Sequence, residues 1–397
     1  MSRINALIKE FCPNGVVFKT VGDVCNVYTG GETPTDLIKE KVPRDDYIYP
    51  VYSNGIGNNA IYGYAKTYRI KDDAVTFSSI GTLGHPEIRK GKFTPIIRLK
   101  VLVPIDLKQL SIRYLKYALE TAEFDNNKSS LPNLNANMLK NIVIPIPPFE
   151  VQEEIVRILD KFGGLEAELE AELEERKSQY EFWRGRLFKQ DIDKMVTLEA
   201  IGDVTKLAGF EFSEYVNYSD DGNIIALRGL NVKNGHLVLD DVKYVDNSDF
   251  SKLNRSKLYE NDILYTYVGT VGQVGLVDKN DKYYLAPNVA RIRIFDEKVN
   301  PKYVMHYLLT NEFKTNQLDA LSGTSSMKNI TMTNIRKFKI PVPSLEKQNR
   351  IVNILDKFDK LVNDMTVGLP AEIELRRKQY EYYRNKLLSF EELSVSE

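Results

Sequence analysis

Two stretches of the chain carry apolar residues at alternating steps of three and four, a pattern typical of a long helix that packs against a partner helix. In the first stretch this apolar seam comprises Ile155, Leu159, Phe162, Leu169, Leu173, Tyr180, Trp183 and Leu187. In the second stretch it comprises Ile351, Leu355, Phe358, Val362, Tyr380, Tyr383 and Leu387. The matching spacing predicts that the two helices pair antiparallel within one chain. The alternative is two unrelated amphipathic helices, each packed on its own local core.

The second helix is expected to be interrupted. Between Leu369 and Ile373 two four-residue steps follow one another, which breaks the heptad register. Gly368 and Pro370 lie at the same place. Since sharp kinks have local causes such as proline, we expect a kink or a break there. The first helix is expected to run without interruption over residues 150–188.

The two stretches are also copies of one another. IPIPPFEVQEEIVRILDKF (residues 144–162) and IPVPSLEKQNRIVNILDKF (residues 340–358) are identical at 12 of 19 positions. RKSQYEFWRGRLF (residues 176–188) and RRKQYEYYRNKLL (residues 376–388) follow them. A repeat of this length indicates two similar halves, each a globular region followed by a long helix, and not a solenoid of short units.

The globular regions combine strand and helix patterns. Residues 74–84 and 262–272 alternate apolar and polar positions and run into glycine-containing turns, which predicts strands. Residues 113–124 and 302–313 predict a helix near the end of each region. Residues 22–24 and 202–204, both Gly-Asp-Val, are expected to be equivalent and to mark the start of each region. The expected fold is α+β, with two pseudo-repeated mixed α/β domains joined by two long antiparallel coiled-coil helices.

The corresponding domain boundaries are residues 1–143 for the first globular region, 144–190 for the first helix, 191–339 for the second globular region, and 340–397 for the second helix and C-terminal tail. Residues 1–143 carry 19 Lys and Arg against 14 Asp and Glu, whereas residues 191–339 carry 19 against 20. With a net charge of −1 for the whole chain, any nucleic-acid binding must come from local basic patches.

Composition favours a cytoplasmic protein that does not enter a membrane. No apolar run approaches the roughly 20 residues of a membrane-spanning helix. Cys12 and Cys25 are the only cysteines, and two cysteines form neither a disulfide framework nor a metal-binding spacing.

The sequence contains no persuasive catalytic or metal-binding constellation. The three histidines, His85, His236 and His306, are far apart in the sequence, and no phosphate-binding glycine loop is present. We therefore expect no catalytic residue, no metal and no cofactor in this chain.

Polar and basic side chains near the predicted strand ends are candidates for DNA contacts, because such groups bind phosphates and base edges. For any single one of them, an ordinary solvated loop residue is the competing interpretation. The candidates are Ser78, Ser79, Thr82, His85, Arg89, Lys90, Lys92, Arg228, Asn231, Lys233, Asn234, Tyr265, Tyr267, Thr270, Gln273, Ser325, Ser326 and Lys328.

Two aromatic residues on the helices, Phe182 and Tyr382, fall outside the apolar seam. A large aromatic side chain away from the helix–helix seam is a candidate anchor for a partner protein. Packing on the adjacent globular region is the equally weighted alternative.

The repeated Ile-Pro-x-Pro…Glu-x-Gln…Ile-Val-x-Ile-Leu-Asp-Lys-Phe and Gln-Tyr-Glu-aromatic-aromatic-Arg blocks resemble those of specificity subunits of type I restriction–modification systems, and the resemblance covers essentially the whole chain. It implies that each globular region is a target-recognition domain for one half of a bipartite site in double-stranded DNA. It also implies a helical spacer that docks two modification subunits, which bind S-adenosylmethionine and methylate adenine, with a separate restriction subunit cutting DNA. No catalysis is implied for the chain itself.

Two other classes remain open from the sequence. One is a self-contained DNA methyltransferase with fused recognition domains, against which the missing nucleotide motif argues. The other is an adaptor whose paired helices bind only protein. DNA affinity and its dependence on salt distinguish the adaptor from a DNA-binding protein.

Overall fold

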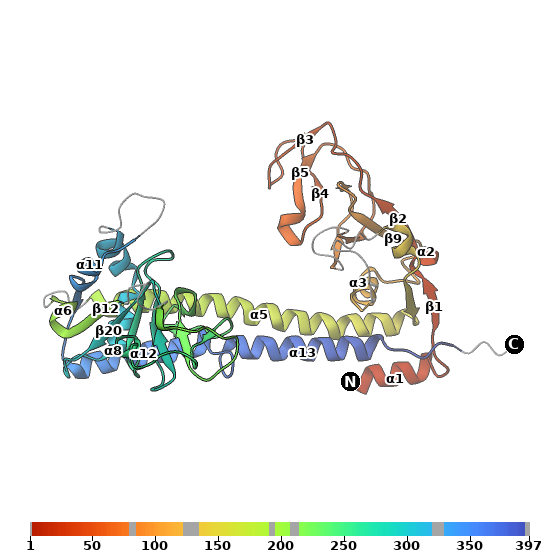
Figure 1. The fold of residues 1–397 in the computed structure, drawn as a ribbon. Coiled ribbons are helices and arrows are strands. Elements are labelled where there is room, and N and C mark those ends of the chain that lie inside the picture. The colour runs from red at the N-terminus through yellow and green to blue at the C-terminus, as the bar shows by residue number, and fades with distance from the viewer. Residues whose placement is uncertain are drawn as a thin grey trace. The chain divides into compact units, whose positions relative to one another are not determined.

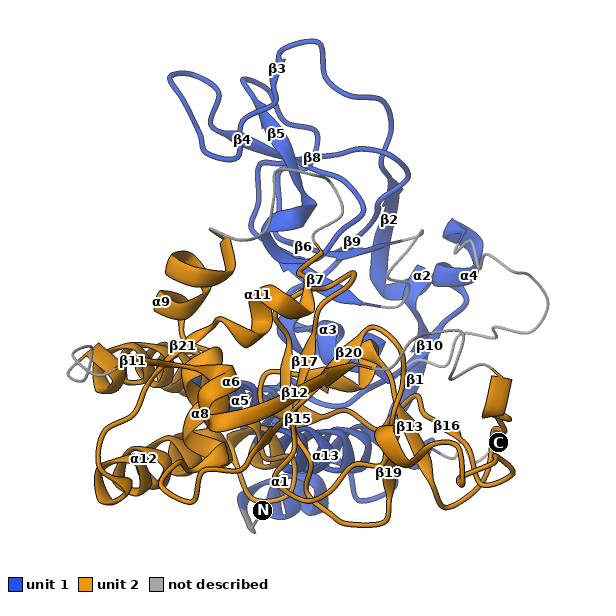
Figure 2. Cartoon of the chain, turned by 60° about the vertical axis from the view of Figure 1, so that its left-hand side comes forward, with its two compact units in different colours: residues 1–169, 373–397 blue, residues 170–372 orange. Residues whose placement is uncertain are grey.

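A computed structural model describes residues 2–78, 85–121, 135–189, 195–206, 214–319 and 329–393. The chain divides into two compact units, shown in Figure 2. Unit 1 comprises residues 1–169 and 373–397, and unit 2 comprises residues 170–372. One long helix, α5 (Phe149–Phe188), contributes to both units, as sequence periodicity predicted to within one residue.

Unit 1 contains a four-stranded antiparallel sheet in the order β2-β9-β6-β7, a second four-stranded sheet in the order β3-β5-β4-β8, and the pair β1-β10. Its elements are α1 (Ser2–Phe11), β1 (Val17–Thr20), α2 (Val21–Val24), β2 (Cys25–Thr29), β3 (Leu37–Ile38), β4 (Tyr49–Tyr52), η1 (Gly57–Ala60), β5 (Ile61–Ala65), β6 (Ala74–Phe77), β7 (Pro86–Arg89), β8 (Thr94–Pro95), β9 (Lys100–Pro104), α3 (Ile112–Glu120), α4 (Ala136–Lys140), β10 (Val143–Ile146), the first half of α5, and most of α13 (Leu369–Leu388).

Unit 2 contains a four-stranded antiparallel sheet in the order β12-β20-β17-β18, a three-stranded sheet β16-β13-β19, and the pairs β14-β15 and β11-β21. Its elements are β11 (Met195–Thr197), α6 (Leu198–Ile201), β12 (Gly202–Lys206), β13 (Ile225–Leu227), η3 (Gly229–Asn231), β14 (Val232–Lys233), β15 (His236–Leu237), β16 (Lys243–Tyr244), η4 (Asn254–Ser256), β17 (Ile263–Thr266), β18 (Val274–Leu276), β19 (Tyr283–Leu285), β20 (Val289–Ile294), α8 (Pro301–Leu308), α9 (Asn311–Phe313), η5 (Lys314–Leu318), α11 (Met332–Arg336), β21 (Lys339–Pro341) and α12 (Leu345–Asn363).

The two units share the order of their principal sheets. In each sheet the first strand along the chain pairs with the last, the last pairs with the second, and the second pairs with the third, which forms an edge. The second sheets differ, with four strands in unit 1 and three strands plus a separate hairpin in unit 2. The repeat inferred from the sequence therefore extends to the globular regions, where one sheet is shared and the other has diverged.

The sequence alignment of the two Gly-Asp-Val triplets is wrong. Residues 22–24 lie in helix α2, where Asp23 and Thr20 form a capping box, whereas residues 202–204 lie in strand β12. The helix equivalent to α2 is α6, which directly precedes β12 in the way that α2 precedes β2. A match of three residues was too short to fix the register of the repeat.

The long helices pair within each unit. In unit 1, α5 and α13 are antiparallel: the Phe162 and Tyr383 rings stack with centroids 5.3 Å apart, and one turn further along Arg377 Nε donates to Glu166 Oε1 at 2.6 Å. Figure 1 shows α5 and α13 running side by side. In unit 2, α5 packs on α12 through the stacked rings of Tyr180 and Phe358, with centroids 5.9 Å apart.

The second long helix is broken where the sequence indicated. Helix α12 ends at Asn363 and α13 begins at Leu369. Between them Gly368 packs so closely on the preceding helix that an added Cβ would lie 2.6 Å from the carbonyl oxygen of Lys360. Only a residue without a side chain allows this approach, so the stutter in the heptad pattern corresponds to a turn that separates two helices.

A buried glutamine fastens the globular part of unit 1 to its long helix. Gln152, on the first turn of α5, is fully buried. Its Oε1 accepts from the backbone N–H of Ser111, the N-cap of α3, at 2.9 Å. Its Nε2 donates to the carbonyls of Gln109, at 2.7 Å, and Pro147, at 2.8 Å. One amide thus joins the helix, the proline segment and the start of α3.

A neighbouring aspartate of the repeated motif strengthens the same junction. Asp160 accepts a hydrogen bond from Tyr117 Oη at 2.7 Å and forms an ion pair with Arg113 at 2.5 Å. Both partners lie on α3. In unit 2, Asp356 lies 3.0 Å from His306 Nε2 and 3.0 Å from Lys302 Nζ, both on α8. The Leu-Asp-Lys-Phe motif therefore binds helix α3 in unit 1 and helix α8 in unit 2.

Candidate nucleic-acid interface

Five cationic side chains gather on one part of unit 1, which we call the basic face: Arg69, Lys71, Lys92, Arg98 and Lys100. The backbone N–H of Lys92 donates to the carbonyl of Lys71 at 3.2 Å. A guanidinium nitrogen of Arg69 lies 2.9 Å from where a Cβ on Gly31 would be. The carbonyl of the preceding residue, Gly30, accepts from the Arg98 N–H at 3.1 Å. These contacts bring segments that are far apart in sequence next to one another.

Most of these cations lack acidic partners. Among the described residues, Arg69, Lys71, Lys92 and Lys100 form no ion pair with a carboxylate. Cations that are not neutralised by the protein's own acids attract anions, and a row of them suits the phosphates of a nucleic acid.

Lys100 is the most constrained member of the basic face. It begins strand β9 and is only 6% exposed, and its Nζ donates to the Thr29 hydroxyl at 3.3 Å. Burial, together with repulsion from the Arg98 guanidinium, lowers the pKa of Lys100. The Lys100 side chain is therefore held below the surface, and the exposed Arg98 is the candidate for a phosphate contact in this part of the face.

A tight turn presents Ile97 and Arg98 within the basic face. Both have left-handed backbone conformations, with φ of 51° and 61°. Asn54 Nδ2 donates to the Ile97 carbonyl, and Ser78 Oγ donates to Asn54 Oδ1 at 3.3 Å. Ser78, a predicted DNA-binding residue, is therefore buried beneath this turn and supports it.

The other predicted residues of unit 1 divide into two groups. His85, Lys90 and Lys92 are exposed, although Lys90 pairs with Asp73 at 3.1 Å. Arg89 is engaged within the protein, where it pairs with Glu87 and lies over the Tyr52 ring at 4.3 Å. Its role as a DNA contact stays a prediction. Ser79 and Thr82 lie outside the described residues.

Three predicted residues of unit 2 have structural roles instead. Tyr265 is 0% exposed within the hydrophobic core, and Tyr267 is also buried. Asn231 is fully buried and its Nδ2 donates to the carbonyls of Val238, at 2.9 Å, and Asp241, at 2.7 Å. These side chains cannot reach DNA in this fold, because the alternating strand pattern that suggested them does not show which face is buried.

The remaining predicted residues of unit 2 surround the β14-β15 hairpin and the turn after β17. Lys233, Asn234 and Thr270 are exposed, and the Asn234 N–H donates to Gln273 Oε1 at 3.4 Å. Arg228 forms an ion pair with Asp241 at 2.9 Å. The hairpin turn is Asn234-Gly235, both with positive φ, as a two-residue hairpin requires. Ser325, Ser326 and Lys328 lie outside the described residues.

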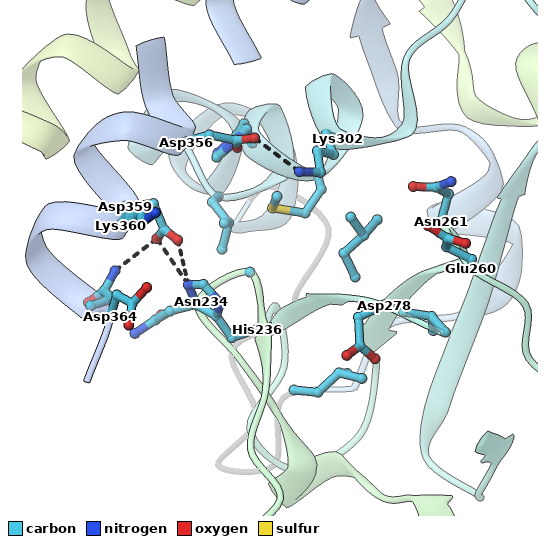
Figure 3. A pocket seen from close by; sticks show the side chains of 18 of the residues that line it. Asn234, His236, Glu260, Asn261, Asp278, Lys302, Asp356, Asp359, Lys360 and Asp364 are labelled. Atoms are coloured by element: carbon cyan, nitrogen blue, oxygen red, sulfur yellow. Dashed lines mark hydrogen bonds and ion pairs between the residues drawn. The ribbon is translucent and has the colours of Figure 1, made fainter. Parts of the chain in front are cut away.

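A cavity of about 720 Å³ in unit 2 lies between this hairpin and helix α12 (Figure 3). Within it His236 Nε2 lies 2.9 Å from Asp359 Oδ2, and the hydrogen bond to Asp359 raises the pKa of His236. His306 is buried in the same wall, and burial lowers the pKa of His306. Among the described residues no cluster of His, Cys, Asp and Glu could hold a metal ion. The His236–Asp359 pair joins the β14-β15 hairpin to helix α12.

Most residues of the predicted helix seam are buried or packed against a core, but two are not. Ile155, Leu159 and Leu387 belong to the core of unit 1, and Ile351, Leu355, Val362 and Tyr180 belong to the core of unit 2. Leu173, Leu187, Phe358, Tyr380 and Tyr383 pack against these cores, and Phe162 stacks on Tyr383. Leu169 is half-buried and belongs to neither core.

Trp183 is the clearest exception, because it is 40% exposed and contacts Phe182 and Arg186 on its own helix. Its seam assignment is corrected to a surface position. Phe182 and Tyr382, the predicted anchors, are 59% and 60% exposed. Exposed aromatic side chains at matched positions of the two repeats are consistent with a docking role, which stays a prediction.

The sequence did not predict the roles of several basic residues or of the helix junctions. These residues are Arg69, Lys71, Ile97, Arg98, Lys100 and Gln152. The positive balance of residues 1–143 was the available signal for the cations, and the repeated Glu-x-Gln was the signal for the glutamine.

Among the described residues, no helix is long and apolar enough to cross a membrane.

The chain matches the family described as type I restriction modification DNA specificity domain, twice, over residues 13–175 and 194–375. It is 31% identical to the EcoR124I/EcoR124II specificity subunit of Escherichia coli, covering 90% of this chain and 91% of that protein. It is 28% identical to a putative type I specificity subunit of Mycoplasma pneumoniae, covering 93% and 96%.

Two solved structures share the fold. A type I restriction-modification S subunit from M. genitalium superposes with a TM-score of 0.53, at 13% identity, over 94% of this chain and 96% of that one. A chain from a structural study of complex assembly in the type I R-M system superposes with a TM-score of 0.58, at 15% identity, over 95% and 98%. The repeated sheets, the matched helices and the two family matches agree: this chain belongs to the type I restriction-modification DNA specificity family.

Proposed function

We propose that this chain is the non-catalytic specificity subunit of a type I restriction–modification complex and recognises a two-part DNA sequence. Each unit recognises one half of the sequence. The observation that carries the proposal is that the units share one sheet and the same glutamine junction but differ in their second sheets. A common frame with divergent additions is what two different half-sites require.

Binding divides into an electrostatic part and a sequence-specific part. The basic face of unit 1 contacts phosphates and fixes the orientation of the duplex, without distinguishing sequences. Discrimination comes from polar and apolar groups that reach base edges in the grooves. The near-neutral charge of the whole chain means that partner subunits supply much of the remaining affinity for DNA.

The long helices set the separation between the half-sites. Helix α5 has 40 residues, which correspond to roughly 60 Å at about 1.5 Å per residue. DNA rises about 3.4 Å per base pair along a strand, so that length matches roughly 18 base pairs. The half-sites are accordingly separated by bases that neither unit contacts.

Catalysis resides in the partners. Two modification subunits bind S-adenosylmethionine and transfer the methyl group, and they dock on the long helices near the exposed Phe182 and Tyr382. Restriction subunits join the same complex in systems that cut DNA. The assignment of chemistry to the partners agrees with the lack of a catalytic motif in the sequence.

The test is to produce the chain with its modification subunits and to map methylated bases across the host DNA by sequencing. The proposal predicts one motif of two fixed blocks, separated by a constant number of unspecified bases, and no such motif when this chain is omitted. A continuous motif, or methylation that does not depend on this chain, would contradict it. The purified chain alone should transfer no labelled methyl group to DNA.

A further inference from the structure

We propose that Ile97 makes an apolar contact with the base pairs of the half-site bound by unit 1, while the exposed Arg98 holds a neighbouring phosphate. The inference rests on the proposed function, because it identifies a specificity-determining residue within the DNA interface.

The backbone at Ile97 is unusual for its residue type. A β-branched residue rarely adopts positive φ, because its Cβ substituents crowd the backbone. Here Ile97 and Arg98 both do so, one after the other. Strained conformations of this kind persist only where surrounding contacts determine them, and they cluster at functional sites.

The surrounding contacts are present. The Ile97 N–H donates to the Gly31 carbonyl at 3.0 Å, and the Leu99 N–H donates to the Ile96 carbonyl at 3.1 Å. Gly30 lies so close that a Cβ there would be 2.8 Å from the Ile96 carbonyl oxygen. The turn is therefore held from several sides before any ligand binds.

The side chain of Ile97 is the part that remains outside. It is 48% exposed, whereas Ile96 is fully buried and Leu99 is 2% exposed. Two buried neighbours anchor the turn and leave a single apolar group projecting at the surface. A rigidly presented apolar side chain suits contact with a thymine methyl group or insertion at a base step.

The charges around Ile97 favour DNA over a protein partner. Arg98 follows it directly, Lys100 begins the next strand, and Arg69 lies over Gly31, whose carbonyl accepts from Ile97. Among the described residues neither Arg69 nor Lys100 forms an ion pair with a carboxylate. An apolar side chain that lies next to basic residues is complementary to base edges flanked by phosphates.

The test uses the full complex with modification subunits and a duplex carrying the motif that the wild-type complex methylates. Ile97→Ala removes the apolar branch, and Ile97→Asn replaces it with a polar group that tolerates left-handed backbone. Both variants should lose about tenfold in affinity for that duplex. Both should also relax the methylated sequence at a position within the half-site of unit 1 only.

Ile105→Ala is the matched control. Ile105 is 58% exposed and lies at the other end of strand β9 from Lys100, so its loss should leave affinity and motif unchanged. Ile97 variants that behave like Ile105→Ala would overturn the inference while leaving the proposed function intact. Loss of modification-subunit binding in place of DNA affinity would overturn it in favour of a protein contact. If the wild-type complex methylated no two-part motif, the proposed function would fail first.

Discussion

Gln152 and Gln348 occupy the same position in the two units and make the same three hydrogen bonds. The Gln348 Oε1 accepts from the N-cap N–H of α8, at Asn300, at 2.8 Å, as Gln152 does from the N-cap of α3. Its Nε2 donates to the carbonyls of Lys298 and Pro343, both at 2.9 Å. The repeated Glu-x-Gln motif is thus a structural junction that binds each recognition region to its helix.

Replacing either glutamine should loosen its own unit. Gln152→Leu leaves the buried Ser111 N–H and the buried Pro147 carbonyl without partners, which costs about 3 kcal/mol or more in the free energy of unfolding. Amide hydrogen exchange should accelerate at Ser111 in Gln152→Leu and at Asn300 in Gln348→Leu. Gln179→Ala is the control, because Gln179 bonds only to Glu175 and Arg176 on its own helix. Unchanged exchange at Ser111 would show that the amide does not hold the junction.

The packing of the long helices on the two cores should depend on the buried seam positions and not on neighbouring leucines. Leu159→Asp or Leu355→Asp places a charge where the side chain is fully buried, at a cost of at least about 3 kcal/mol. Soluble yield and the thermal unfolding midpoint should fall. Leu165→Asp and Leu361→Asp, at 37% exposed positions on the same helices, should leave both nearly unchanged. Equal effects at buried and exposed positions would count against the seam.

The C-terminal segment of unit 1 should be released by a side chain at Gly15. The Val16 N–H donates to the Glu391 carbonyl at 2.9 Å, and a Cβ on Gly15 would lie 2.5 Å from that same oxygen. Gly15→Ala should therefore make residues 391–393 accessible to carboxypeptidase digestion. Gly57→Ala provides the control, since Gly57 also has positive φ but open space around it, and it should leave the segment protected. Equal protection in both variants would contradict the steric account.

Unit 2 should lose stability as pH rises above the ordinary pKa of histidine. Because Asp359 raises the folded-state pKa of His236, the contribution of the pair is fully present below about pH 6.5 and is lost as pH rises through the raised value. His306 acts in the opposite sense, because burial lowers its pKa: the folded state is penalised as pH falls below about 6.5. In His236→Gln, the loss of stability above about pH 6.5 should become smaller. The loss of stability at lower pH, which comes from His306, should remain. An NMR titration that placed the His236 pKa at or below its ordinary value would contradict this prediction.

Helices were the part of the fold most accessible from the sequence. The heptad spacing located α5 to within one residue, and the stutter located the break at Gly368, because both depend on local periodicity. The pairing order of the sheets was not accessible, since strands that are neighbours in space are distant in sequence. The shifted Gly-Asp-Val alignment shows the same limit.

The candidate site was less predictable than the fold. Residue type suggested Tyr265 and Asn231 as DNA contacts, but non-local packing buries both. Conversely, Ile97 and Arg98 carry no motif, and their significance arises from a backbone turn that Gly30, Gly31 and Asn54 create together. Burial and backbone conformation, which decide whether a polar group faces solvent, are properties of the folded chain.

The most direct test of independent recognition by the two units is an exchange of residues 21–143 for the same region of a related specificity subunit. The methylated motif is then determined by sequencing DNA from cells that carry the hybrid with the modification subunits. Because the helices and unit 2 are retained, we predict that one half of the motif changes, while the other half and the number of intervening bases stay the same. A hybrid that changed both halves together would contradict the account.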